Sequence, residues 1–67
     1  MVIIVNNEVE HFNEESILLS ELLLRKNIKT TNSAVAVNKV FINRSKYDTT
    51  ALHDNDDVVI FSAAYGG

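Results

Sequence analysis

The sequence predicts an α+β fold in which one helix packs on one face of a mixed sheet, with elements in the order β-β-α-β-β-β. Only one segment, residues 17–26, has Leu-rich helical spacing. Short β-branched runs lie on both sides of it, as is typical of strands. The first and last runs, residues 2–5 and 58–61, are the most continuously apolar. We therefore expect them to be central, parallel neighbours that are joined through the helix.

The N-terminal residues predict a β-hairpin. Residues 2–5 and 9–12 are short apolar runs separated by Asn6-Asn7-Glu8. Asn tolerates the left-handed conformation that a tight turn requires, so the two runs are expected to pair.

The helix is expected over residues 17–26, with Ser16 as its N-cap. Leu19, Leu22 and Leu23 follow the i, i+3, i+4 spacing of a stripe that faces the core.

The second half of the chain predicts three more strands, over residues 34–37, 40–42 and 58–61. Residues 43–50 are polar, with room for one helical turn, and Asn55 is the expected left-handed residue of a turn at residues 54–56. This order of elements is the β-grasp, or ubiquitin-like, arrangement. We expect residues 1–67 to form a single β-grasp domain with a flexible C-terminal tail at residues 62–67.

Composition excludes several classes of function. The chain has 67 residues and no Cys, which excludes disulfides, thiolate zinc sites and a Cys nucleophile. A net charge of −3 and a pI of about 5.1 argue against a nucleic-acid partner. No apolar run approaches the roughly 18 residues of a membrane helix, and the N-terminus lacks a basic signal-peptide region. We expect a cytoplasmic protein with neither membrane nor nucleic acid as partner.

Charged residues are sorted into three blocks. Five acids and no Lys or Arg occur in residues 1–24, six bases and no acid in residues 25–46, and four acids and no base in residues 48–57. We expect the blocks to attract one another within the fold. The alternative is a charged surface that orients a partner.

No constellation of side chains supports catalysis. His11 and His53 lack a second ligand at metal spacing, and Asp54, Asp56 and Asp57 lack the Gly and final Glu of a calcium loop. The serines lack a nucleophile elbow, and no Gly-rich phosphate loop is present. We therefore expect the protein not to be an enzyme.

Both glycines of the chain occupy its last two positions, Gly66 and Gly67. A frayed terminus is the simplest interpretation of such an end. However, Gly-Gly has no Cβ, so an extended tail could enter a narrow channel in another protein. There the terminal carboxylate could be adenylated and then attacked by a persulfide. After reduction the product would be a thiocarboxylate, which suits a sulfur carrier that has no Cys.

A set of short elements occurs in fixed order along the second half of the chain: Val35-Ala36-Val37-Asn38, Arg44, Tyr47, Thr50, Leu52, Asp56, Val58, Phe61 and Gly66-Gly67. Together they resemble the ThiS family, the sulfur carriers of thiamine thiazole biosynthesis. The resemblance spans the chain and is strongest over residues 35–67. It departs from the family pattern at Asn43, Asn55, Tyr65 and the expected helix start, residues 16–19.

The resemblance implies a carrier and co-substrate rather than a catalyst. An E1-like adenylyltransferase would use ATP and Mg²⁺ to adenylate Gly67, so this chain itself would bind no cofactor. A sulfur donor such as a cysteine desulfurase would supply the sulfur, and thiazole synthase would accept it. Gly66 and Tyr65 would thread into the partner with the terminus.

Alternation along the strands predicts a docking surface. Successive side chains of a strand point to opposite faces of the sheet, so every second residue faces the helix and the residues between face away. This places Ile4, Ala36, Val59 and Phe61 together on the open face of the sheet, where an apolar patch typically marks an interaction site.

Two further functions remain open from the sequence. One is a sulfur carrier for molybdopterin synthesis or tRNA thiolation, although 67 residues favour the thiamine carrier. The other is a ubiquitin-like interaction module whose C-terminus is never activated.

Overall fold

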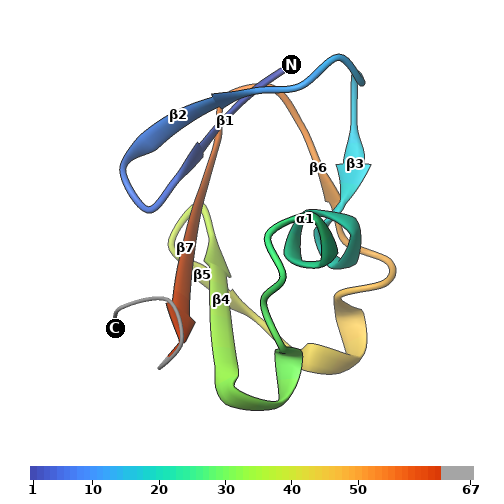
Figure 1. The fold of residues 1–67 in the computed structure, drawn as a ribbon, viewed down its shortest axis with the longest axis vertical. Helices are drawn as coiled ribbons and strands as arrows, with labels where there is room; N and C mark the ends of the chain where they lie inside the picture. Colours follow the sequence, from blue (N-terminus) through green and yellow to red (C-terminus); the bar gives the residue numbers. More distant parts are fainter. Residues whose placement is uncertain (63–67) are drawn as a thin grey trace.

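Five strands form one mixed sheet in the order β2-β1-β7-β4-β5 (Figure 1). The structure is a computed structural model that describes residues 1–62. Central strand β7 runs parallel to β1 and antiparallel to β4. The predicted fold class and the predicted parallel pairing of the first and last strands are both confirmed. The five strands are β1 (Val2–Val5), β2 (Glu8–His11), β4 (Ser33–Val37), β5 (Val40–Ile42) and β7 (Asp56–Ser62).

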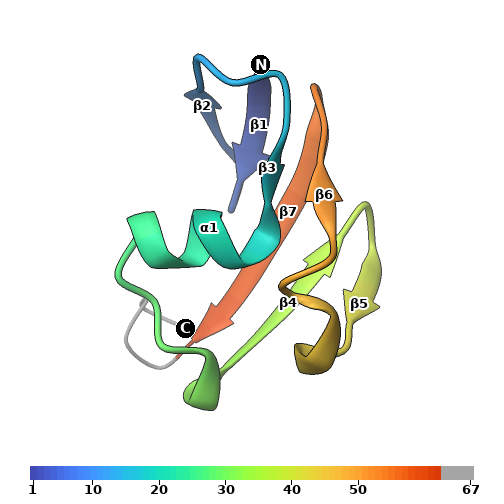
Figure 2. The same cartoon turned by 90° about the vertical axis from the view of Figure 1, so that its right-hand side faces the viewer.

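Helix α1 (Leu19–Arg25) covers one face of this sheet (Figure 2). A second, two-stranded sheet pairs β3 (Ile17–Leu18) with β6 (Ala51–Leu52). These two strands were not predicted, because two residues are too few to show a hydrophobic period. Two 3₁₀ helices, η1 (Thr30–Asn32) and η2 (Arg44–Lys46), complete the described elements. The second of them is the helical turn expected within residues 43–50.

The start of the helix differs from the prediction, since Ser16 is not its N-cap. The helix begins at Leu19, and no side chain caps it. Instead, the backbone N–H of Leu19 donates to the carbonyl of Thr50 at 2.8 Å, and that of Ser20 donates to the carbonyl of Tyr47 at 3.0 Å. A segment some thirty residues away in sequence thus satisfies donors that every helix N-terminus leaves free.

The end of the helix follows a local rule. Asn27 adopts a left-handed conformation with φ of 58°. Its N–H donates to the carbonyl of Leu24 at 3.1 Å, and the N–H of Ile28 donates to the carbonyl of Leu23 at 3.0 Å. These two bonds form a Schellman motif, which stops the helix and turns Ile28 onto the core.

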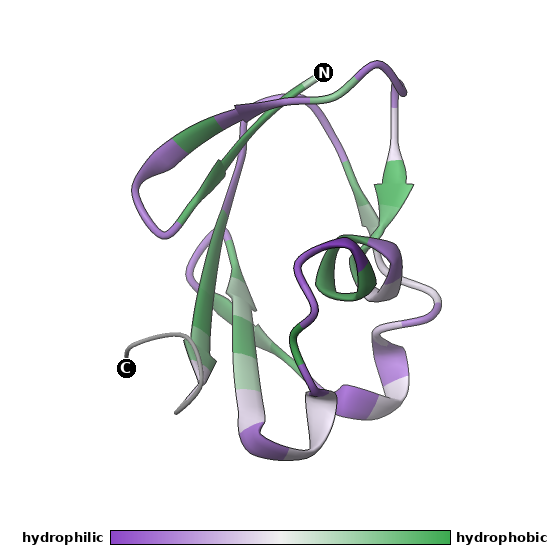
Figure 3. Ribbon diagram, in the orientation of Figure 1, coloured by the Kyte–Doolittle hydropathy of each residue, from purple (hydrophilic) through white to green (hydrophobic). Residues whose placement is uncertain are grey.

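The core lies between the sheet and the helix. Figure 3 shows that β1, β7, β4 and the helix are largely made of apolar residues. The predicted helix stripe is confirmed, because Leu19, Leu22 and Leu23 are fully buried. Tyr47 is also buried, which places the η2 segment over the same core. The buried cluster consists of Ile3, Val5, Ile17, Leu19, Leu22, Leu23, Val35, Tyr47, Leu52, Val58 and Ile60.

Two asparagines continue the hydrogen bonding of β7 beyond its paired neighbours. The amide of Asn6 accepts from the N–H of Ile60 at 2.7 Å and donates to the carbonyl of the same residue at 3.2 Å. On the other side of the strand, Asn38 accepts from the N–H of Asp57 and donates to the carboxylate of Asp56, both at 3.0 Å. The amide of Asn6 therefore takes the place of a further backbone residue of β1, whereas that of Asn38 bonds one backbone group and one side chain of β7.

Asn6 and Asn38 also have positive φ, as do four other residues within 1–62. The left-handed residues expected at Asn6-Asn7 and Asn55 are thus confirmed. Lys39 adopts this conformation as well, although it lacks the short polar side chain that favours it. The six residues are Asn6, Asn7, Asn27, Asn38, Lys39 and Asn55.

The expected tail lies largely outside the described residues. Ser62, which was assigned to the tail, is the last residue of β7 and is buried. Residues 63–67, with Tyr65, Gly66 and Gly67, are not described. Within residues 1–62, no helix is long and apolar enough to cross a membrane.

Replacing Asn6 should test the contribution of its amide to stability. We expect Asn6→Gly to lower the free energy of unfolding by about 1–3 kcal/mol, because two backbone groups of Ile60 lose their partner. Asn7→Gly is the matched control, since Asn7 also has positive φ but is exposed. Its effect should stay within about 0.5 kcal/mol. Urea denaturation measures both, and equal effects would show that the amide of Asn6 adds nothing.

Candidate functional site

The face of the sheet that the helix leaves uncovered carries a continuous set of apolar side chains. Along β7, Val58 and Ile60 are buried against the helix, whereas Val59 is half-buried and Phe61 is 49% exposed on the opposite side. The predicted alternation of this strand is therefore confirmed. We call this uncovered side the open face. Its residues are Val2, Ile4, Val9, His11, Ala34, Ala36, Phe41, Asp57, Val59 and Phe61, as the strand register places them.

An aromatic pair dominates the open face. The rings of Phe41 and Phe61 have centroids 5.8 Å apart and planes inclined by 31°. Strand β4 runs between them, where Ala34 is paired with Phe61, and Ala36 with Phe41. The two small alanines allow the rings to meet above β4, a geometry that aromatic pairs favour.

Three of the four predicted docking residues contribute accessible surface to the open face. Ile4 and Val59 are half-buried, and Phe61 is exposed. Ala36 points to the same side, but it is buried and serves as support for its larger neighbours. The prediction did not include Phe41, which is 67% exposed. The sequence did offer a signal for Phe41. Its neighbour Ile42 packs against the core, so the side chain of Phe41 must point to the opposite face of the sheet.

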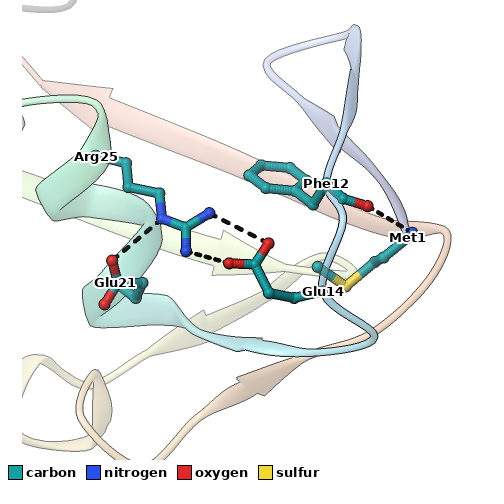
Figure 4. A network of polar contacts seen from close by, with 5 residues as sticks. All are labelled: Met1, Phe12, Glu14, Glu21 and Arg25. Atoms are coloured by element: carbon teal, nitrogen blue, oxygen red, sulfur yellow. Dashed lines mark hydrogen bonds and ion pairs between the residues drawn. The ribbon is translucent and has the colours of Figure 1, made fainter.

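The ion pairs of the described residues lie around the end of the helix, on the other side of the sheet. Arg25 binds the carboxylates of Glu14 and Glu21, and its guanidinium lies 6.0 Å from the ring centroid of Phe12 (Figure 4). Lys26 pairs with Glu10 at 2.6 Å. The expected attraction between the first acidic block and the basic block is therefore confirmed for these residues.

The second acidic block behaves differently, because two of its four acids accept hydrogen bonds from backbone N–H groups. Asp54 accepts a hydrogen bond from the N–H of Val2 at 2.6 Å, and Asp56 accepts one from the N–H of His53 at 2.8 Å. No ion pair joins this block to a base within residues 1–62. The expected attraction between the basic block and this acidic block therefore stays a prediction.

Hydrogen bonding to Arg25 lowers the pKa of Glu14, with a smaller contribution from a backbone hydrogen bond. The two glutamates in turn raise the pKa of Arg25. Both partners are exposed, so the network orients the segment before β3 against the helix end more than it stabilises the fold.

Groups suited to catalysis or metal binding do not converge in the described structure. His11 and His53 are exposed on separate elements. Residues 1–62 contain no group of three or more His, Asp or Glu side chains that could hold a metal ion, and no pocket. Within the same residues, the open face is an accessible apolar surface on which Phe41 and Phe61 are both exposed.

Comparison with known proteins agrees with this geometry. The ThiS family model matches residues 2–67. The chain belongs to the ThiS family. A crystal structure of the thiamine biosynthesis protein ThiS from Geobacter metallireducens is similar, with a TM-score of 0.86 and 25% identity over 92% of this chain and 93% of that one. A search of curated proteins gave no match. The resemblance noted from the sequence is therefore confirmed. This ThiS-family chain is a small carrier of the kind that supplies sulfur in thiamine biosynthesis.

Removing the guanidinium should change how Glu14 titrates. We expect Arg25→Gln to raise the pKa of Glu14 toward its ordinary value. The pKa of Glu14 is lower in the folded state than in the unfolded state. The hydrogen bond between Glu14 and Arg25 therefore stabilises the fold fully at a pH above the unfolded-state pKa of Glu14. This stabilisation is lost as the pH falls through the lower, folded-state pKa. The stability difference between wild type and variant should therefore be largest at neutral pH and vanish in acid.

An NMR titration of the Glu14 side-chain carboxyl carbon measures this pKa directly. Lys26→Gln is the control, since Lys26 pairs with Glu10 instead. An equal rise in the pKa of Glu14 in both variants would contradict the assignment to Arg25.

Proposed function

We propose that this chain carries sulfur as a thiocarboxylate at Gly67 and donates it for formation of the thiamine thiazole. The observation that carries the proposal is the family match over residues 2–67, which includes the terminal Gly66-Gly67 pair. The open face supports it, because a carrier must bind successive enzymes.

The chemistry requires two activations by partners. A carboxylate oxygen of Gly67 attacks the α-phosphorus of ATP bound with Mg²⁺ in an E1-like adenylyltransferase, and pyrophosphate leaves. A persulfide on a partner protein, loaded by a donor such as a cysteine desulfurase, then displaces AMP to give an acyl disulfide. A thiol reductant cleaves the S–S bond and releases the thiocarboxylate. Thiazole synthase accepts the sulfur, and the carrier returns with its carboxylate.

The architecture suits delivery of the terminus. Residues 63–67 follow directly on β7, a central strand that is paired on both sides. Five residues reach at most about 18 Å when fully extended. The partner must therefore bind close to the end of β7, where Phe61 is exposed on the open face. The body of the domain would then hold Tyr65 and Gly66 at the entrance of the partner's channel.

Altering the terminus should abolish sulfur loading. We expect deletion of Gly67, or addition of one residue after it, to prevent loading while the circular dichroism spectrum stays unchanged. Incubation with ATP, the adenylyltransferase and a sulfur source, followed by intact-mass analysis, should show one oxygen replaced by sulfur in the wild type alone. Equal loading of the extended chain would contradict the proposal.

A charge at the aromatic pair should block docking. We expect Phe61→Asp to weaken binding to the adenylyltransferase by about tenfold or more, since aromatic anchors dominate many interfaces. Leu24→Asp is the matched control, because Leu24 is 72% exposed on the helix, away from the open face. Titration calorimetry measures both affinities, and thermal melting shows that both variants fold. Equal affinities would exclude the open face as the docking surface.

A further inference from the structure

The described strands place one acidic side chain, Asp57, on the open face, and its neighbours there, Ile4 and Val59, are apolar. Asp57 lies directly beside Ile4 in the parallel register of β1 and β7, and Val59 follows it on the same face. Its backbone is fixed, because its N–H donates to the amide of Asn38 at 3.0 Å and its carbonyl accepts from the N–H of Asn38 at 2.7 Å. The backbone of Asp57 is therefore fixed, and the strand register places its side chain on the open face.

The fold makes no use of this carboxylate. Asp54 and Asp56, close to it in the chain, both accept hydrogen bonds from backbone N–H groups. The carboxylate of Asp57 takes part in no hydrogen bond or ion pair with the residues that the structure describes. Lys39 lies close by in the β4–β5 turn but is exposed and forms no ion pair with it.

Any partner that covers this part of the open face must compensate the negative charge of Asp57. Asp57 is already half-buried. A partner in contact with Ile4 and Val59 would remove the water that still solvates the Asp57 carboxylate. A carboxylate that is desolvated without a partner opposes binding strongly, whereas one that meets a cation is compensated.

We propose that the adenylyltransferase presents an Arg or Lys side chain to the carboxylate of Asp57, and that this ion pair fixes the orientation in which the carrier docks. The inference rests on the proposed function and adds the chemistry of the partner's surface. The Phe41 and Phe61 rings supply apolar area that fits many surfaces, but they do not discriminate one apolar partner from another. A fixed charge does, because it attracts a surface with a cation at that point and repels one with an acid there.

Substitution of Asp57 tests the inference with purified adenylyltransferase as the probe. We expect Asp57→Asn and Asp57→Leu each to weaken binding by about tenfold, and the salt dependence of the affinity to fall in both. Asp48→Asn is the matched control, since Asp48 is exposed in the segment after η2, and it should bind as the wild type does. Thermal melting establishes that all three variants fold.

Each other outcome overturns the inference in a distinguishable way. Wild-type or tighter binding by Asp57→Leu would show that no cation faces this position. If Phe61→Asp still weakens binding in that case, docking through the open face survives and only the ion pair is lost. If Phe61→Asp also binds normally, the docking surface itself is wrong. Sedimentation of the carrier alone as a dimer that Asp57→Asn dissociates would assign the face to a second copy of the chain instead.

Discussion

The structure depends on the pairing of β7 with β1 on one side and with β4 on the other. Parallel pairing of the first and last strands requires a crossover between them, and the single helix lies in that connection. The amides of Asn6 and Asn38 prolong both pairings beyond the regular register. Strand β7 is therefore paired along both edges, which fixes the position of Ser62, the last described residue, within the domain.

This arrangement gives the sheet one covered face and one open face. One face is closed by the helix and the η2 segment, and Leu19, Leu22 and Tyr47 are buried there. A domain of this size buries only about 60% of the surface of its unfolded chain, so it has few apolar residues to spare. The exposure of Phe41 and Phe61 on the opposite face is consistent with a second purpose. The small side chains of Ala34 and Ala36 bring these rings together at a site beside the end of β7.

The acids of the described chain differ in what they contact, although they look alike in the sequence. Glu14 ties the segment before β3 to the helix end through Arg25. Asp54 and Asp56 accept backbone hydrogen bonds and so hold the turn before β7. Asp57 is placed by the same turn but remains unused by the described fold, which makes it the acid best suited to an external partner. Charge counting along the chain does not separate these roles, because each depends on which backbone or side-chain groups lie opposite.

Features with a local period or a local conformational preference were determined by the sequence itself. The stripe of Leu19, Leu22 and Leu23 and the alternation along β7 were predictable from spacing, and Asn6 and Asn55 from the left-handed preference of asparagine. The order of these elements was enough to predict the β-grasp fold. Expectations that concern residues 63–67 stay predictions, because they lie outside the described residues.

Tertiary structure decided the features that join distant segments. The start of the helix is set by carbonyls of Tyr47 and Thr50, so Ser16 could not be excluded as a cap from its neighbours in sequence. Phe41 joins Phe61 on the open face only because β4 separates them in the sheet. Likewise, the carboxylate of Asp57 lies among apolar side chains because β7 pairs with β1 in one register. Contacts between segments far apart in the chain leave no periodic trace in the sequence, since nothing in either segment alone records which residues will lie opposite.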